Sequence, residues 1–547
     1  MPAVPGPVAR ALAAIEAATT AVDTAPTLPA RFALLLRPEQ DPVEKRREIE
    51  TGLAPLGARV RPLSPQENRI LVAEFPTRVF GVDEAGAFAA AYALADAFDL
   101  ESAEPDLPTN FFPQPPRSLA TKEPVEEGLG FPLDCWAPAQ PELNDKPRWA
   151  LTSMRVDQAW AYSEQRQRPD RGVDIIIAQP DTGVTPHPEL ADVVRVAPRD
   201  VLDDDEDPTD PLISDGLLGN PGHGTETASV VVSPETLTVV GTAPKATHMP
   251  IRAIESVIRL SQITVAAGIE WAVHHGAHVI SMSLGGIPSF SLHRAVRRAV
   301  AADVLVVAAA GNCVKLVVWP ARYDDCIAVA GTDVDDHEWR GTCRGAAVAV
   351  SAPGQNVIRA SAVLGEPPSV GQGQGTSFAV ALTAGVAALW LAHHGRANLI
   401  AAARARGETL QAMFRRLIRA TARRPAEWDA FSMGAGIIDA RALLEADLDA
   451  GRDRESAPQP DDAAARDTIA VQSLVLEAAG PGAIPPDLDW RRYGPEIAAA
   501  VLRRQLSGLG PQPELARATS LSPELASVVR GSALGEYLGV TPAAGQP

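Results

Sequence analysis

Three short motifs bring together side chains that can perform nucleophilic catalysis. Asp181-Thr182-Gly183-Val184 follows an apolar run, Gly222-His223-Gly224-Thr225 comes next, and Gly375-Thr376-Ser377-Phe378-Ala379 comes last. A serine hydroxyl is a weak nucleophile until a base removes its proton, and an imidazole oriented by a carboxylate is an effective base near neutral pH. The motifs therefore predict Asp181, His223 and Ser377 as a catalytic triad.

The surroundings of these residues fit that chemistry. Ser377 directly precedes the apolar run 378–392, which predicts a buried helix whose N-terminus favours developing negative charge. Asn312 follows another apolar run, and its side-chain amide could donate to an oxyanion together with the backbone N–H of Ser377. We therefore expect Asn312 to complete an oxyanion hole.

Each motif alone has a simpler explanation. Asp181 could end a strand, His223 could be a buried core histidine, and Ser377 could cap a helix. Asp-Thr-Gly also occurs in aspartic proteases, but these need two carboxylates, and the sequence has no second Asp-Thr-Gly or Asp-Ser-Gly. The joint occurrence of the three motifs favours catalysis by serine.

The elements around the motifs alternate between strand and helix. Strands are expected at 173–178, 248–251, 279–283 and 304–309, and helices at 258–275 and 292–302. This alternation predicts an α/β fold with a mainly parallel sheet covered on both faces. In such sheets, ligands bind beyond the carboxyl ends of the strands, where several of the motifs lie.

The regions outside this domain differ in composition. Residues 1–30 are predicted to be a loose leader or short helix, and 31–106 have the β-α-β-β-α-β order of a ferredoxin-like α+β module. A proline-rich linker is expected at 107–147, a catalytic domain at 148–447 and a second linker at 448–467. Residues 468–547 have short helical segments to which no fold can be assigned.

Together the motifs resemble those of the subtilisin-like serine proteases, or subtilases, over residues 149–445. Asp, His and Ser occur in the chain order of that family. The resemblance implies a three-layer α/β sandwich and a serine endopeptidase that acts through an acyl-enzyme on protein or peptide substrates. It also implies that the module at 31–106 is an inhibitory propeptide, so that the N-terminal domain is a partner of the catalytic domain.

Two further segments resemble substrate-binding parts of subtilases. One is similar to the segment that pairs with the substrate backbone and lines one side of the primary specificity pocket, and the other is similar to the opposite side of that pocket. The residues concerned are Ser283, Leu284, Gly285 and Gly286 in the first segment and Ala309, Ala310 and Gly311 in the second.

The sequence departs from the family after the histidine motif. Glu226-Thr227 stands where subtilases usually have His-Val. Glu226 would lie one helical turn from His223, and we expect its charge to alter the pKa of the base. Pro180, Phe378 and Ala381 are further departures, and none removes a catalytic group.

The net charge of −19 argues against a nucleic-acid partner, which needs a concentrated basic surface. Four cysteines without a CxxC motif make a zinc site improbable, and we expect them to be free thiols in a reducing compartment. No cofactor is required. The acidic stretch 203–210 could bind structural calcium, but it lacks the glycine and spacing of an EF-hand, so a solvated loop is favoured.

No secretion signal is recognisable, because Arg10 is the only early basic residue and Glu16 interrupts the apolar stretch. The run 378–392 is also too short to span a bilayer, so no membrane partner is expected. We therefore expect a cytoplasmic protein, with secretion by another route left open.

Three functional hypotheses remain. One is an active endopeptidase, and another is a catalytically impaired pseudoprotease that only binds peptides. The third is an active protease held latent by residues 1–147.

Overall fold

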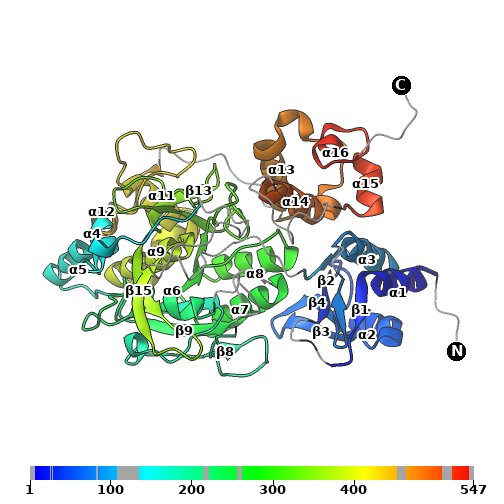
Figure 1. The fold of residues 1–547 in the computed structure, drawn as a ribbon, viewed down its shortest axis with the longest axis horizontal. Coiled ribbons are helices and arrows are strands. Elements are labelled where there is room, and N and C mark those ends of the chain that lie inside the picture. Colours follow the sequence, from blue (N-terminus) through cyan, green and yellow to red (C-terminus); the bar gives the residue numbers. More distant parts are fainter. Residues whose placement is uncertain are drawn as a thin grey trace.

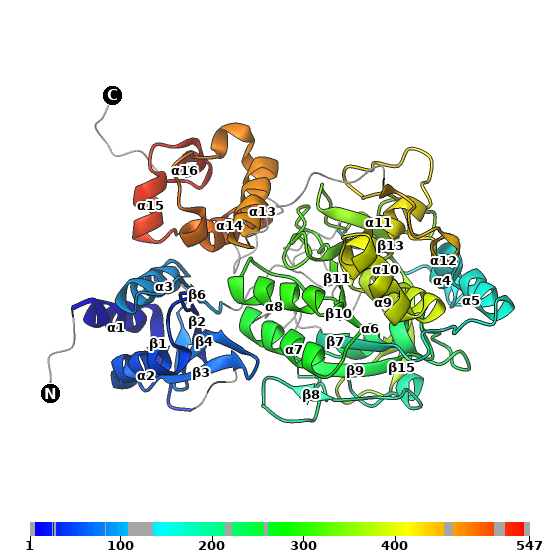
Figure 2. The same cartoon turned by 180° about the vertical axis from the view of Figure 1, so that it is seen from behind.

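The computed structural model describes residues 6–24, 26, 29–81, 84–107, 135–213, 221–255, 261–452, 463–507 and 520–540. Figure 1 shows three lobes: an N-terminal lobe in blue, a large central lobe from cyan to yellow, and a C-terminal lobe in orange and red. Figure 2 shows the same arrangement from behind, with the helices of the C-terminal lobe next to both other lobes.

The central lobe is built on a seven-stranded sheet with the order β13-β12-β11-β10-β7-β9-β8. Every neighbouring pair in it is parallel. Its strands are β7 (Ile176–Asp181), β8 (Arg199–Asp200), β9 (Thr247–Arg252), β10 (Val279–Met282), β11 (Leu305–Ala309), β12 (Ile327–Thr332) and β13 (Val348–Pro353). The strands expected at 173–178, 248–251, 279–283 and 304–309 correspond to β7, β9, β10 and β11.

Helices cover both faces of this sheet. Side chains alternate along each strand, so Ile280 and Val306 pack with α7 (Gln262–His274) and α8 (Phe290–Ala301) in one apolar core. Val279 and Leu305 point the other way and pack with α9 (Thr376–His394) in a second core. The predicted three-layer α/β sandwich is confirmed.

The remaining elements of the central lobe lie around the second core and the edges of the sheet. They are α4 (Trp149–Ser153), α5 (Val156–Gln165), α6 (His223–Val232), α10 (Arg396–Ala405), α11 (Leu410–Thr421), α12 (Ala440–Glu445), the 3₁₀ helices η4 (Pro141–Leu143) and η5 (Pro188–Leu190), and the antiparallel hairpin β14 (Val357–Ser361) and β15 (Ser369–Gly373).

α9 is the one helix in the described part of the chain that is long and apolar enough to cross a membrane. It is entirely buried within the protein, as the core helix predicted from 378–392 should be.

The N-terminal lobe has the predicted β-α-β-β-α-β order. Its antiparallel sheet has the order β3-β4-β2-β6, and α2 and α3 are the helices of the predicted module. The elements are β2 (Ala30–Leu35), α2 (Pro42–Leu53), η1 (Ala54–Leu56), β3 (Arg59–Ser64), β4 (Glu67–Phe75), β5 (Arg78–Phe80), α3 (Glu84–Ala97) and β6 (Ser102–Pro105).

The segment before this module contains a helix, one of the two possibilities expected for residues 1–30, but it is not a separate leader. α1 (Gly6–Ala18) buries Ala11 and Ile15 completely in the core that contains α3. β1 (Thr19–Ala21) then pairs with β5. The apolar spacing of α1 gives it one face to bury, so it becomes part of the N-terminal lobe.

The expectation of four free thiols is wrong for two of them. Cys135 and Cys313 form a disulfide with their Cα atoms 5.7 Å apart, although 178 residues separate them in sequence. Cys326 and Cys343 are free and buried. The linker expected at 107–147 lies largely outside the described residues, but its end from Cys135 onward is attached to the central lobe by this disulfide.

The C-terminal lobe consists of helices in its described part, where the sequence allowed no fold to be assigned. They are α13 (Ala463–Ala479), η7 (Pro481–Ala483), α14 (Trp490–Ser507), α15 (Pro523–Val529) and α16 (Ala533–Tyr537). Most of the second linker expected at 448–467 lies outside the described residues or at the start of α13.

Candidate active site

Asp181 is the last residue of β7, whose neighbours in the sheet are β10 and β9. Its side chain is buried, and Oδ1 accepts a hydrogen bond from the backbone N–H of Thr182 at 2.7 Å. A carboxylate at the carboxyl end of a central parallel strand lies where open α/β sheets bind their ligands. The structure thus holds Asp181 at the edge of the sheet that the sequence predicted.

His223 begins α6 and faces Asp181. Its Nδ1 lies 2.7 Å from Asp181 Oδ1. Gly222 precedes it with a φ of 85°, and a Cβ at Gly224 would lie 2.1 Å from the carbonyl oxygen of Gly183. The two glycines are therefore required for α6 to approach the end of β7 so closely.

The environment of His223 favours the protonated imidazole. Burial opposes the positive charge, but the charge and hydrogen bond of Asp181 outweigh it and raise the pKa of His223 above its ordinary value. The carboxylate of Glu226 acts in the same direction, as expected from the sequence. Glu226 also forms an ion pair at 3.3 Å with Arg359 of β14, and both side chains are largely buried.

A polar network that the sequence analysis did not identify lies next to Asp181 and His223. Gln179 donates to Thr227 Oγ1 at 2.6 Å and to the Gly224 carbonyl at 3.0 Å, and its Oε1 contacts His248 Nε2 at 2.9 Å. Burial lowers the pKa of His248 to about 3, so this imidazole is neutral and donates through Nε2. Thr227 Oγ1 lies 3.3 Å from Asp181 Oδ2. The sequence contained one sign of this network, because Gln179 is a polar residue within β7, which is otherwise apolar before Asp181.

Ser377 lies at the start of α9, beside the segment after β10. Its Oγ donates weakly to the Ser283 carbonyl at 3.4 Å, and Ser283 Oγ donates to the Ser377 carbonyl at 3.0 Å. Among the described residues, His223 Nε2 has no hydrogen-bond partner. The structure therefore has the histidine–aspartate hydrogen bond of a triad but not the serine–histidine one.

Asn312 is oriented for donation toward Ser377. Its Oδ1 accepts from the N–H and the hydroxyl of Thr376, at 3.0 and 2.9 Å, which leaves Nδ2 on the other side. A Cβ on Gly375, where φ is 151°, would lie 3.4 Å from Asn312 Nδ2 and 3.7 Å from Ser377 Oγ. The amide and the hydroxyl thus border the same small space, which the missing side chain keeps open.

The two predicted substrate-binding segments lie next to each other, because they follow the paired strands β10 and β11. The backbone of Gly286 exchanges hydrogen bonds with Trp319, at 2.7 and 3.3 Å, so it is not free to pair with a peptide. On the other side, Ala310 N–H donates to Val329 and Gly311 N–H to Thr376 Oγ1. These contacts hold the backbone of the second segment, residues 309–311, in one position next to the first segment.

The acidic stretch 203–210 is largely occupied by internal partners. Asp203 pairs with Arg252, Asp204 pairs with Arg199, and Asp210 accepts from Thr182 Oγ1 at 2.6 Å. A different group, Asp333, Asp335 and His337, has ligand atoms within 4.8 Å of one another, with two of the three side chains exposed. Exposed acidic groups of this kind are common without an ion, so we assign no metal there.

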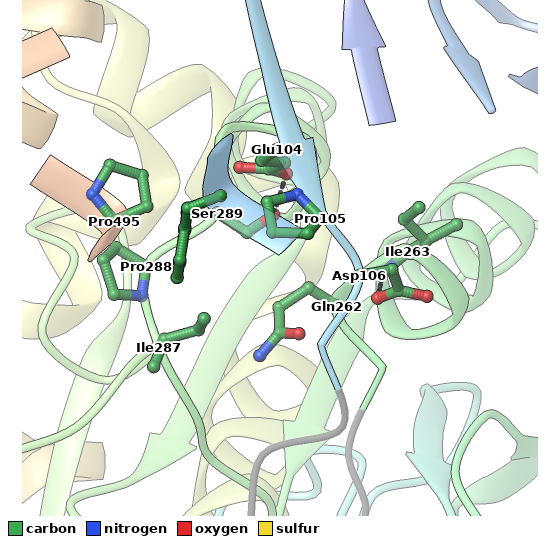
Figure 3. Close-up of a pocket in the computed structure, with 10 residues that line it drawn as sticks. Glu104, Pro105, Asp106, Gln262, Ile263, Ile287, Pro288, Ser289 and Pro495 are labelled. Atoms are coloured by element: carbon green, nitrogen blue, oxygen red, sulfur yellow. Dashed lines mark hydrogen bonds between the residues drawn. The ribbon is translucent and has the colours of Figure 1, made fainter. Parts of the chain in front are cut away.

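The N-terminal lobe contacts the central lobe through two carboxylates at the end of β6. Glu104 accepts from the N–H groups of Phe290 and Ser291 and from two serine hydroxyls at the start of α8. Asp106 accepts from Ser261 Oγ at 2.6 Å and Ile263 N–H at 3.3 Å at the start of α7. Figure 3 shows Glu104 next to Ser289 and Asp106 next to Ile263. Both carboxylates cap helices that carry positive N-terminal dipoles.

Comparison with known proteins gives one consistent result. The model of the subtilase family matches residues 172–442. Thermitase of Thermoactinomyces vulgaris is 35% identical over 267 residues, which cover 48% of this chain and 87% of thermitase. Subtilisin BL of Lederbergia lenta is 34% identical over 221 residues, 40% of this chain and 76% of that protein.

A solved structure supports the fold. The crystal structure of fervidolysin from Fervidobacterium pennivorans, described as a keratinolytic enzyme related to subtilisin, matches with a TM-score of 0.53 and 22% identity. The match covers 77% of this chain and 61% of that one.

Proposed function

Because the chain belongs to the subtilase family and is a serine endopeptidase, we propose that Asp181, His223 and Ser377 are its catalytic triad and that its N-terminal lobe holds it latent. The observation that carries the triad is the buried 2.7 Å contact between His223 Nδ1 and Asp181 Oδ1, at the sheet edge where Ser377 and Asn312 also lie. This contact fixes the imidazole with Nε2 available to act as a base.

In the proposed reaction, the Ser377 hydroxyl turns from the Ser283 carbonyl toward His223 Nε2 when a peptide binds. His223 takes the proton as Ser377 Oγ forms a bond to the peptide carbonyl carbon, and Asp181 stabilises the resulting imidazolium. Asn312 Nδ2 and the Ser377 N–H donate to the oxyanion. The imidazolium then protonates the leaving amine, and water releases the acyl-enzyme by the same steps.

The substrate would bind as an added strand. The backbone of Ser283 to Gly285 follows β10, and we propose that it pairs with an extended peptide. The primary pocket would lie between this segment and the wall that contains Ala309, Ala310 and Gly311. The fixed backbone of that wall supports a pocket of constant shape, since its N–H groups already have protein partners.

Latency is supported by the way in which the N-terminal lobe is attached. Glu104 and Asp106 provide further acceptors for the N-termini of α8 and α7, in addition to the N-cap side chains of Ser289 and Ser261. The chain then leaves the lobe after Leu107 and is next described at Cys135, which is bonded to the neighbour of Asn312. The connection between the lobes thus begins beside α7 and α8 and ends beside the oxyanion hole.

A fluorophosphonate, which labels only an activated serine, tests the triad and latency together. We expect intact mass and peptide mapping to find one label on Ser377 after the connection is cut within 108–134 and the N-terminal lobe is removed, much slower labelling of the uncut chain, and none in Ser377→Ala. Fast labelling of the uncut chain would contradict latency. Absence of label after the cut, in a chain whose N-terminal lobe has been removed, would instead support the pseudoprotease alternative.

A further inference from the structure

The C-terminal lobe is bonded to the central lobe through a buried ion pair. Arg322, which lies in the segment between β11 and β12, forms two parallel bonds to Glu477 of α13, at 3.1 and 2.7 Å, and also reaches Ser473. The Arg322 side chain is 2% exposed. Leu474 and Val475 of α13 are fully buried in the core that contains α8. Bidentate pairs of this kind fix orientation as well as contact.

The same lobe is bonded to the N-terminal lobe through a buried polar network. Tyr92 of α3 donates to Glu496 of α14 at 2.8 Å, and Glu496 also accepts from the hydroxyl of Ser522 at 2.9 Å. Tyr92 and Glu496 are each 3% exposed. The ring of Tyr92 makes an edge contact with Tyr493, with centroids 5.4 Å apart. A buried carboxylate with several donors specifies one partner surface.

Complementary charges surround this network on α14 and the N-terminal lobe. Arg492 pairs with Asp96 at 3.0 Å and is held by Glu524 at 2.8 Å. Arg503, near the other end of α14, pairs with Glu84 at the start of α3. The N-terminal lobe therefore has basic partners along the length of α14, in addition to α7 and α8.

We propose that the C-terminal helices are a bracket that holds the N-terminal lobe on the central lobe, so that cutting the 108–134 connection alone does not release it. The bracket contacts one lobe through α13 and the other through α14, and Figures 1 and 2 both show α14 beside α3 and α13 beside the central lobe. The N-terminal lobe is thus held at two separate surfaces, and two linked contacts dissociate far more slowly than either alone.

The experiment measures retention of the N-terminal lobe without relying on activity. The full chain carries Ser377→Ala, an affinity tag on the N-terminal lobe and a specific cleavage site inserted within 108–134. After cutting, we expect the central and C-terminal lobes to stay with the tag. Glu84→Arg should then make their dissociation about tenfold faster or more, because it leaves Arg503 facing a like charge.

Matched variants separate this mechanism from general destabilisation. Glu84→Arg combined with Arg503→Glu restores the pair in reverse and should restore retention. Tyr92→Phe should weaken it without changing charge. Arg530→Ala, at an exposed position on the C-terminal lobe, should leave retention unchanged. Dissociation of Glu84→Arg at the rate of the parent, or failure of the reversed pair to restore retention, would overturn the bracket.

The bracket bears on regulation only if the proposed latency is correct. The same variants with an intact Ser377 test the bracket and the latency separately. If the N-terminal lobe inhibits, activity should rise in step with its release. A cut chain that is active while it still retains the N-terminal lobe would refute latency and leave the bracket standing.

Discussion

At the level of single residues, the oxyanion donor can be tested most directly. Asn312 is fixed by Thr376, so its replacement removes a preoriented donor and leaves the triad in place. We expect Asn312→Ala to lower kcat about 100–1000-fold, a loss of about 2.7–4 kcal/mol, with little change in KM. Steady-state kinetics of the released enzyme measures this. The exposed Asn398→Ala is the control, and an equal loss in it would point to instability.

The second test at this level concerns the base. The Glu226 carboxylate raises the pKa of His223. Removing this carboxylate also leaves the positive charge of Arg359 without its Glu226 partner, and that charge further favours the neutral imidazole of His223. A lower pKa keeps His223 competent at lower pH, so Glu226→Gln should move the acid limb of the kcat/KM profile to lower pH. Glu338→Gln, whose carboxylate pairs with Arg344 instead, should not. A shift of the limb to higher pH would contradict this electrostatic account.

The thiol chemistry also differs from the sequence expectation of four free thiols. Cys313 is bonded to Cys135, and burial raises the pKa of Cys343 to about 12 and that of Cys326 above its usual range. Thiolates are the reactive form, so these sites resist alkylation. We expect iodoacetamide without reductant to leave activity and mass unchanged. A labelled, inhibited protein would show that the disulfide is absent.

At the level of secondary structure, the cap that Glu104 provides on α8 makes docking of the N-terminal lobe depend on pH. Burial raises the pKa of Glu104 from its ordinary 4.5 to about 7, although four donors oppose the shift. Docking therefore takes up a proton, so its free energy is most favourable below pH 4.5 and is lost progressively as pH rises to about 7.

We accordingly expect the cut Ser377→Ala chain to release its N-terminal lobe faster as pH rises across this window and to change little above it. Glu104→Gln, which stays neutral, should reduce the dependence, whereas exposed Glu39→Gln should retain it in full. Dissociation rates from pH 4 to 8 provide the measurement. A slower release at higher pH would show that the donors, and not burial, dominate Glu104.

At the level of the whole molecule, the Cys135–Cys313 disulfide connects the end of the interlobe connection to the oxyanion loop. Its removal frees a long loop in the unfolded chain, and we expect Cys135→Ser with Cys313→Ser to cost about 2–4 kcal/mol of stability. A lower thermal midpoint, with a reduced kcat from the adjacent Asn312, is the expected result. An unchanged midpoint would remove the structural role.

The sequence determined the three motifs around Asp181, His223 and Ser377, the parallel sheet and the buried helix after Ser377. Each of these features is encoded locally. The alternation of strands and helices, the glycines beside His223 and the apolar run after Ser377 are each visible within a short stretch of sequence. The β-α-β-β-α-β order of the N-terminal module could be predicted for the same reason. The departure at Glu226 was visible too, because its spacing from His223 on a helix fixes their proximity.

Only the tertiary structure decided which distant residues meet. Gln179, Thr227 and His248 come from three elements, and no local pattern relates them. The disulfide closes across 178 residues, and the C-terminal helices acquire a role only because α14 packs on Tyr92. Such contacts depend on how whole lobes pack, and packing is set by surfaces assembled from many segments rather than by the spacing within one.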